Sequence, residues 1–150
     1  MRPTERTLQY LQNHASLAGI VERFNRHAGP FGRHFDLFGL FDVIAIRPNR
    51  KPIGNAYEIV AVQCCGGSTR AEHEQKMMSM TPEKKGDRSN YEKLRWWLRA
   101  GGEAELWAWR KRVRLKKDLT PSKTPQWTCS VTRFILITDA KVGQIQGELV

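Results

Sequence analysis

Two short segments in the first half of the chain are almost entirely apolar. Residues 41–46 read FDVIAI and residues 57–65 read YEIVAVQCC, and turn-forming residues separate them from the rest of the chain. A strand that is covered on both faces of a sheet shows such a nearly continuous apolar run, whereas a half-exposed strand alternates. Helices must then pack on the sheet, so the two segments predict an α/β fold.

The order α-β-β-β-α-α-β-β-β predicts one domain over residues 1–150, a mixed sheet flanked by helices. Gly39 predicts a tight turn between two strands, and the T-x-x-E pattern from Thr69 to Glu72 predicts a capping box. The first helix contains no proline and is expected to end at Gly29-Pro30. The expected helices cover residues 4–28, 69–80 and 91–100, and the expected strands lie within 31–46 on both sides of Gly39 and at 57–65, 103–109, 110–117 and 127–138.

The chain is strongly basic. Its 150 residues carry 25 Lys and Arg against 15 Asp and Glu, a formal charge of +10, while the hydrophobic fraction of 40% is that of an ordinary globular protein. This composition excludes disorder over the whole chain, and the length fits one domain. The charge predicts a polyanionic partner, most simply nucleic acid; the alternative is that it only keeps the protein soluble.

Several classes of protein are not indicated. The longest apolar runs, such as residues 40–46 and 134–137, are far shorter than the roughly 20 residues that span a bilayer, and the N-terminal segment has no signal-peptide core. The three cysteines, Cys64, Cys65 and Cys129, are odd in number and lack zinc-site spacing. We therefore expect no membrane partner, and a reduced, cytoplasmic protein.

Each of the two apolar segments contains one polar residue suited to bind a cation. Asp42 is the only charge in the first, and Gln63 lies near the end of the second. A divalent cation such as Mg²⁺ or Mn²⁺ takes carboxylate, amide and carbonyl oxygens, so Asp42, Gln63 and the backbone carbonyl of Cys64 are candidate metal ligands. A metal held there would activate water and stabilise charge on a phosphate oxygen.

The layout of a helix, then G-x-F-D-V-I-A-I, then a strand ending V-Q-C-C, then a helix resembles the PD-(D/E)XK superfamily of metal-dependent nucleases. The resemblance is greatest to small Holliday-junction-resolvase-like and phage-encoded members. It covers residues 4–110 and implies a restriction-endonuclease-like αβββαβ core, followed by a basic strand and a final strand within residues 110–138. It also implies a homodimer, because two strands must be cut symmetrically.

The resemblance implies roles for individual residues. Asp42 matches the motif aspartate, Gln63 the (D/E) position, and Glu22 the acid of the first helix. Position 65, where the motif lysine is expected, is Cys65, and Lys76 on the following helix is the candidate for a migrated lysine. The catalytic candidates are therefore Asp42, Gln63, Lys76 and Glu22.

Two classes of function remain open. The first is a Mg²⁺- or Mn²⁺-dependent endonuclease, a hydrolase acting on DNA, with branched DNA as a candidate substrate. The second is a nuclease fold that has lost cleavage and kept nucleic-acid binding, which the residues Gln63 and Cys65 favour. A third, weaker alternative is a small basic phage protein that binds a protein partner.

Other residues have a functional and a structural interpretation. Asp36 can join the metal site or stay outside it, His73 can transfer a proton or be an exposed histidine, and a Cys64 or Cys65 thiol is a remote nucleophile candidate. Trp96, Trp97, Trp107 and Trp109 can stack on bases or, more often, fill the core. The predicted phosphate contacts are the basic residues of the second half: Arg110, Lys111, Arg112, Arg114, Lys116 and Lys117.

Overall fold

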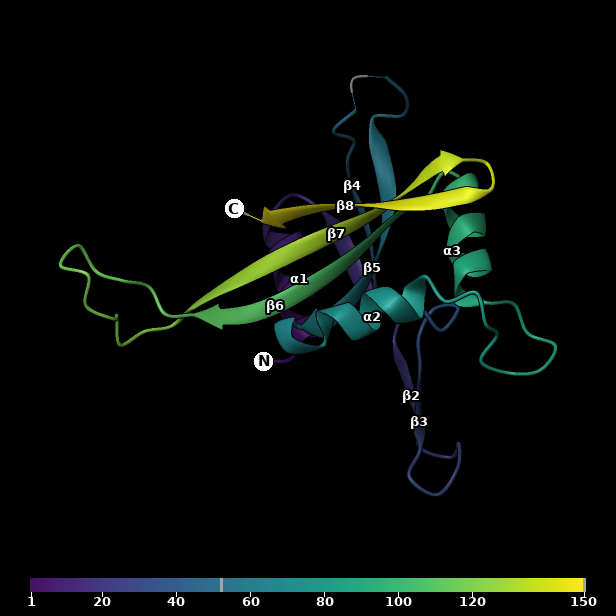
Figure 1. Cartoon of the computed structure of the whole chain (residues 1–150), viewed down its shortest axis with the longest axis horizontal. Helices are drawn as coiled ribbons and strands as arrows, with labels where there is room; N and C mark the ends of the chain where they lie inside the picture. The colour runs from purple at the N-terminus through teal and green to yellow at the C-terminus, as the bar shows by residue number, and fades with distance from the viewer. Residues whose placement is uncertain (52, 150) are drawn as a thin grey trace.

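A six-stranded mixed sheet forms the centre of the protein (Figure 1). The computed structural model describes residues 1–51 and 53–149. The strand order is β1-β4-β5-β6-β7-β8; β5 and β6 are parallel, and the other neighbours are antiparallel. The strands are β1 (Leu17–Ile20), β4 (Val43–Pro48), β5 (Tyr57–Gly66), β6 (Glu103–Arg112), β7 (Gln126–Thr138) and β8 (Lys141–Leu149). The predicted mixed α/β fold is confirmed.

Helices pack on both faces of this sheet. Helix α1 (Pro3–Asn13) contributes Leu11 to a core with Val62 and Trp107, while α2 (Arg70–Met77) and α3 (Asn90–Arg99) pack on the opposite face. Successive residues of β5 point alternately into the two cores, as the pleat requires, which explains its continuous apolar sequence. No helix in the described ranges is long and apolar enough to span a membrane.

The predicted helix over residues 4–28 is wrong beyond Asn13. His14 is the C-terminal cap of α1, and Ala15 has a φ of +57°, which turns the chain out of the helix. Residues 17–20 then form β1, where Leu17 pairs with Ile46 and Ile20 with Val43. The apolar spacing suited a helix, but hydrogen bonding to β4 outweighs that weak local preference.

The region before β4 also differs from its prediction. Within residues 31–38, only Arg33–Phe35 (β3) is a strand, and it pairs with β2 (Arg23–Asn25) rather than with β4. Gly39 does form a turn, with a φ of +71° and its N–H donating to the Asp36 carbonyl at 3.0 Å. The β2–β3 hairpin projects from the body as a separate arm, which leaves the β4 edge to β1 (Figure 1).

Three smaller expectations are corrected. The Thr69 side chain makes no capping hydrogen bond to α2, because a 3₁₀ turn at Gly67–Thr69 precedes the helix and the hydroxyl donates to the Gly66 carbonyl. The strand expected at 110–117 ends at Arg112, beyond which the chain is an exposed loop. The strand at 127–138 is not the last, because β8 pairs along β7.

Candidate active site

The site is centred on two polar side chains where β4 begins and β5 ends. Asp42 immediately precedes β4 and continues the register that pairs Val43 with Val62, so it lies opposite Gln63. Gln63 Nε2 donates a hydrogen bond of 2.7 Å to Asp42 Oδ2, and both residues are buried. The structure therefore brings together the two side chains that the sequence analysis names as candidate ligands of one cation.

Asp42 ionises with difficulty in this environment. Burial is the main reason that its pKa is about 7, well above the ordinary 3.8. The Cys64 N–H donates to Oδ2 at 2.8 Å and lowers the pKa, the carboxylates of Asp36 and Glu22 raise it, and the Lys76 charge lowers it. A buried carboxyl group with a raised pKa beside other charges is typical of functional sites.

Two oxygens of this pair have no protein donor. Gln63 Oε1 is buried without a hydrogen-bond partner among the described residues. Both hydrogen bonds to Asp42 fall on Oδ2, and within the described chain none reaches Oδ1. Because buried polar atoms are nearly always satisfied, this amide oxygen next to a carboxylate has room for a water, a cation or another donor group. These oxygens fit a hard cation such as Mg²⁺ or Mn²⁺.

The backbone of Cys64 is the third predicted ligand. The contact it makes to Asp42 uses its N–H, but in an extended strand the C=O of the same residue faces the same edge. Its carbonyl is therefore also directed toward the edge where β4 begins. Within the described ranges, no three His, Cys, Asp or Glu side chains converge on one metal position. A cation here would complete its ligands with water or substrate oxygens.

Two more acids lie beside the pair. The Glu22 N–H is 3.3 Å from the Asp42 carbonyl, and its carboxylate Oε1 lies 2.5 Å from His34 Nδ1. Asp36 is half-buried; burial raises its pKa, and the Lys76 charge lowers it. Glu22 was expected on the first helix and instead lies between β1 and β2, because that helix ends early. Pairing of β1 with β4 nonetheless brings it to the site.

Helix α2 contributes Lys76 and His73. The Lys76 charge acts on both Asp42 and Asp36, which places the half-buried ammonium group on the acidic side of the sheet. His73 Nδ1 is buried and has no hydrogen-bond partner among the described residues. Burial and the Lys76 charge lower the pKa of His73, which favours its neutral imidazole.

The thiols are unsuited to act as nucleophiles. Burial raises the pKa of Cys65 to about 11 and that of Cys64 well above its ordinary value. Cys65 lies in the core beneath α2 and α3, whereas Cys64 lies in the core beneath α1. Both groups are protonated at neutral pH, and the thiolate is the reactive form. These cysteines act as small core residues.

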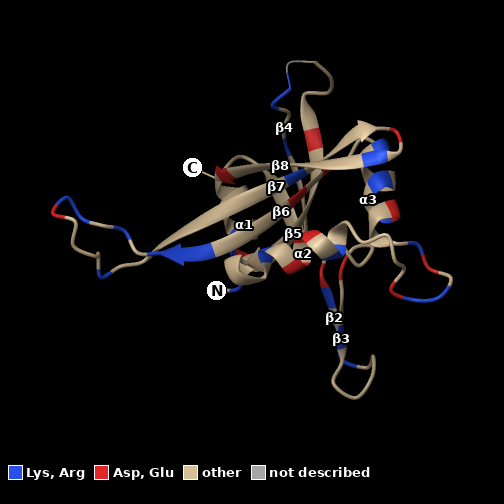
Figure 2. Ribbon diagram, viewed as in Figure 1, with Lys and Arg blue, Asp and Glu red and all other residues tan. Residues whose placement is uncertain are grey.

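The end of β6, the loop that follows it and the start of β7 form a long extension, residues 110–128, which we call the β6–β7 extension (Figure 2). The six basic residues predicted to contact phosphate lie on it. Arg110 and Arg112 each lie within 4 Å of Glu148 on β8, at 3.6 and 3.2 Å, so their charge is partly compensated. Lys111 alternates with them and lies near the Trp127 ring. The other three are in the exposed loop beyond β6: Arg114, Lys116 and Lys117. Their contact with phosphate remains a prediction.

Most of the tryptophans are structural. Trp107 and Trp109 are buried in the core beneath α1, and Trp97 Nε1 donates to the Glu103 carbonyl at 2.8 Å. Trp96 is different, because it is 55% exposed and carries the Arg88 guanidinium 4.4 Å from its ring centroid. The core interpretation therefore holds for three of these four tryptophans.

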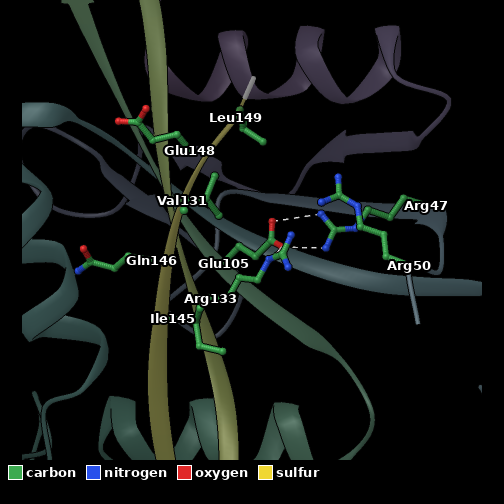
Figure 3. A pocket seen from close by; sticks show the side chains of 10 residues that line it. Arg47, Arg50, Glu105, Val131, Arg133, Ile145, Gln146, Glu148 and Leu149 are labelled. Atoms are coloured by element: carbon green, nitrogen blue, oxygen red, sulfur yellow. Dashed lines mark hydrogen bonds and ion pairs between the residues drawn. The ribbon is translucent and has the colours of Figure 1, made fainter. Parts of the chain in front are cut away.

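The opposite face of the sheet holds a buried ion-pair network that the sequence did not indicate. Arg47 donates to both oxygens of Glu105, at 2.7 and 3.1 Å (Figure 3). It also donates to Glu58 at 2.6 Å. Trp107 and Arg133 also contact Glu105. Burial opposes ionisation of Glu105, but its partners hold its pKa below the usual value. Because both Glu105 oxygens have donors, this network is structural.

Comparisons of the chain with protein-family models, with curated proteins and with solved structures found no match. The function proposed below rests on the geometry of the site itself.

Proposed function

We propose that the protein is a metal-dependent endonuclease of the PD-(D/E)XK type that acts on DNA. The observation that carries this proposal is the buried Asp42–Gln63 pair, with its orphaned amide oxygen and Lys76 on the adjacent helix. Gln63 Oε1 has no donor among the described residues, so it is available to bind a cation. An acid, an amide oxygen and a lysine suit hydrolysis of a phosphodiester.

The order of the elements supports the proposal. Helix α1 is followed in the sheet by β1, β4 and β5, each antiparallel to its neighbour, then by α2 and α3, and then by β6, which is parallel to β5. This order is compatible with the αβββαβ core that the resemblance implies, with the β2–β3 hairpin inserted after the first strand and a second helix before β6. Of the two candidate ligands, Asp42 immediately precedes the second strand of that unit and Gln63 lies on the third.

The residues of the chain have separate roles in this proposal. Asp42, Gln63 and the Cys64 carbonyl would hold Mg²⁺ or Mn²⁺, and the bound metal supplies water activation and charge stabilisation at phosphate. Lys76 orients the attacking water or stabilises negative charge on the phosphate. Glu22 carries charge next to Asp42 and can bind water. The basic β6–β7 extension holds the DNA backbone on either side of the cleaved bond.

A cleavage assay tests the proposal. Linear, nicked and four-way-junction DNA are incubated with the protein in Mg²⁺, Mn²⁺ or EDTA. We expect metal-dependent cleavage that Asp42→Asn abolishes while DNA binding in Ca²⁺ is retained, because the substitution preserves shape and removes the charge that attracts the cation. Asp139→Asn, a matched change at an exposed turn, should cleave like the wild type. Full cleavage by Asp42→Asn would refute the mechanism.

A nucleic-acid-binding protein without cleavage is the second candidate. Cys65 replaces the motif lysine, and Gln63 supplies an amide where a carboxylate would bind a divalent cation more strongly. Salt-sensitive DNA binding by a wild type that cleaves none of these substrates would favour this candidate.

A further inference from the structure

The β2–β3 hairpin is an exposed arm with aromatic side chains that have no core to fill. It comprises residues 23–35 and projects from the sheet below α2 (Figure 1). Phe31 is 92% exposed, and Phe24 and Phe35 are each about half exposed. A two-stranded hairpin is marginal without packing, and exposed apolar groups gathered in one place usually mark a binding surface.

The charge of the arm is entirely positive. Arg23, Arg26 and Arg33 are exposed, and residues 23–35 contain no Asp or Glu. In Figure 2 the strands of this hairpin carry basic residues, and acidic ones appear where it joins the body. The 81–89 loop differs, because it includes Glu83 and Asp87. Arginines interleaved with exposed aromatic rings suit a nucleic-acid strand, which offers phosphates and base faces.

The arm is fixed to the candidate active site at its base. The N–H of Val21 donates to the Asp42 carbonyl at 2.8 Å, and Glu22 contacts His34 across the two strands. Asp36 follows β3 directly. Two of the acids that act on Asp42 therefore flank the two ends of the hairpin. A ligand on the arm would continue into the site.

We infer that the β2–β3 hairpin binds unpaired nucleotides of the strand whose phosphate lies at the Asp42–Gln63 site, an inference that rests on the proposed function. Phe31 supplies a stacking surface, and Arg26 and Arg33 contact phosphates. The nucleotides are unpaired because a duplex hides the base faces on which an aromatic ring stacks. A second copy of the chain is disfavoured as the occupant, since it would bring another basic arm on a protein of charge +10.

Binding without divalent metal tests the inference apart from cleavage. The labelled probes are a single-stranded DNA oligonucleotide, the same sequence as a duplex, and that duplex with a short unpaired bulge, each titrated in EDTA by fluorescence anisotropy. Phe31→Ala should weaken binding to the single strand and the bulge roughly 10-fold and leave the duplex unchanged, which is the size of effect expected of one stacked base. Phe31→Trp should retain affinity. Ile53→Ala, at an equally exposed apolar position, is the control.

Removal of charge gives a second measurement. Arg26→Ala with Arg33→Ala should lower the log–log salt slope for the single strand by about 1.4, at about 0.7 per phosphate contact. The matched pair Lys84→Ala with Lys85→Ala should leave that slope unchanged. An unchanged affinity and slope in both hairpin variants, or a wild type that binds none of the probes, would overturn the inference. So would a Phe31→Ala effect confined to self-association in size-exclusion chromatography.

Failure of the two proposals can be told apart. A wild type that binds unpaired DNA through Phe31 but never cleaves would overturn the proposed function and support nucleotide binding by the β2–β3 hairpin. The opposite result is that Phe31→Ala, and the double variant Arg26→Ala with Arg33→Ala, cleave at the wild-type rate and bind DNA with the wild-type affinity. This result would support the proposed function and overturn the inference that the hairpin binds nucleotides.

Discussion

At Asp42, burial and ionisation oppose each other. The carboxyl group accepts two hydrogen bonds on Oδ2, yet burial keeps its pKa at about 7. The residue is therefore partly protonated at neutral pH when no cation is bound. A bound cation would favour the ionised form, so protons and metal compete for this position.

Stability should therefore depend on pH through Asp42. The group titrates near 3.8 when unfolded and at about 7 when folded, so between these values the folded state binds more protons and the free energy of unfolding falls as pH rises. We expect a loss on the order of 3 kcal/mol between pH 4 and pH 8, measured by urea unfolding without divalent metal. Asp42→Asn should remove most of this dependence, and Asp139→Asn should keep it. An identical pH profile for the wild type and Asp42→Asn would contradict the raised pKa.

Gln63 is expected to limit metal affinity. Gln63→Glu places a second carboxylate 2.7 Å from the first, which should destabilise the metal-free protein by like-charge repulsion and strengthen divalent binding. Thermal unfolding at pH 8 with and without Mn²⁺ measures both effects. The Mn²⁺-induced rise in Tm should be larger for Gln63→Glu than for the wild type. The control Gln9→Glu, on the exposed face of α1, should show the same rise as the wild type. A smaller rise for Gln63→Glu would argue against a metal at this pair.

Among the elements, the β6–β7 extension concentrates the unpaired basic charge. Lys116→Glu with Lys117→Glu should weaken duplex binding and reduce the log–log salt slope by about 0.9 for each phosphate that these lysines neutralise in the wild type. The measurement is a salt titration in Ca²⁺ or EDTA. Lys84→Glu with Lys85→Glu makes the same charge change in the 81–89 loop and should have a smaller effect. Equal reductions in the two pairs would show that net charge, and not this extension, governs binding.

Across the whole molecule, the Arg47 network joins four neighbouring strands. Arg47 on β4 contacts Glu58 on β5 and Glu105 on β6, and Arg133 on β7 reaches the same Glu105. Removing one partner of a buried ion pair leaves an uncompensated charge, whereas an exposed pair contributes little. Glu105 therefore depends on its partners from β4 and β7 to remain ionised in the core.

Arg47→Met should lower the free energy of unfolding by about 3 to 5 kcal/mol, because Glu105 stays buried without its main partner. Lys51→Met breaks the exposed pair with Glu103 and should cost about 1 kcal/mol or less. Urea unfolding at pH 7 compares the two. Similar losses of stability for both variants would mean that Glu105 is relieved by Arg133 or by water.

Across the whole molecule, the sequence determined some elements locally, and only the tertiary structure decided the others. The apolar runs at 41–46 and 57–65 were enough to predict the two central strands and the meeting of Asp42 with Gln63, because burial on both faces leaves a local pattern. Helix α3 was likewise predictable from its periodicity and the glycines that follow it.

Other parts of the fold depended on partners that are distant in sequence. Residues 14–28 carry helix-like spacing, but β1 forms because the edge of β4 needs hydrogen-bond partners. Strand β8 is polar and contains Gly143 and Gly147, so its sequence hardly indicates a strand; it exists because β7 offers an unpaired edge. Strand pairing also decided where Glu22, Asp36 and the β2–β3 hairpin between them lie. Burial leaves a hydrophobic pattern in the local sequence. Pairing between distant strands leaves no such pattern, because it depends on backbone hydrogen bonds that form only when the whole sheet is assembled.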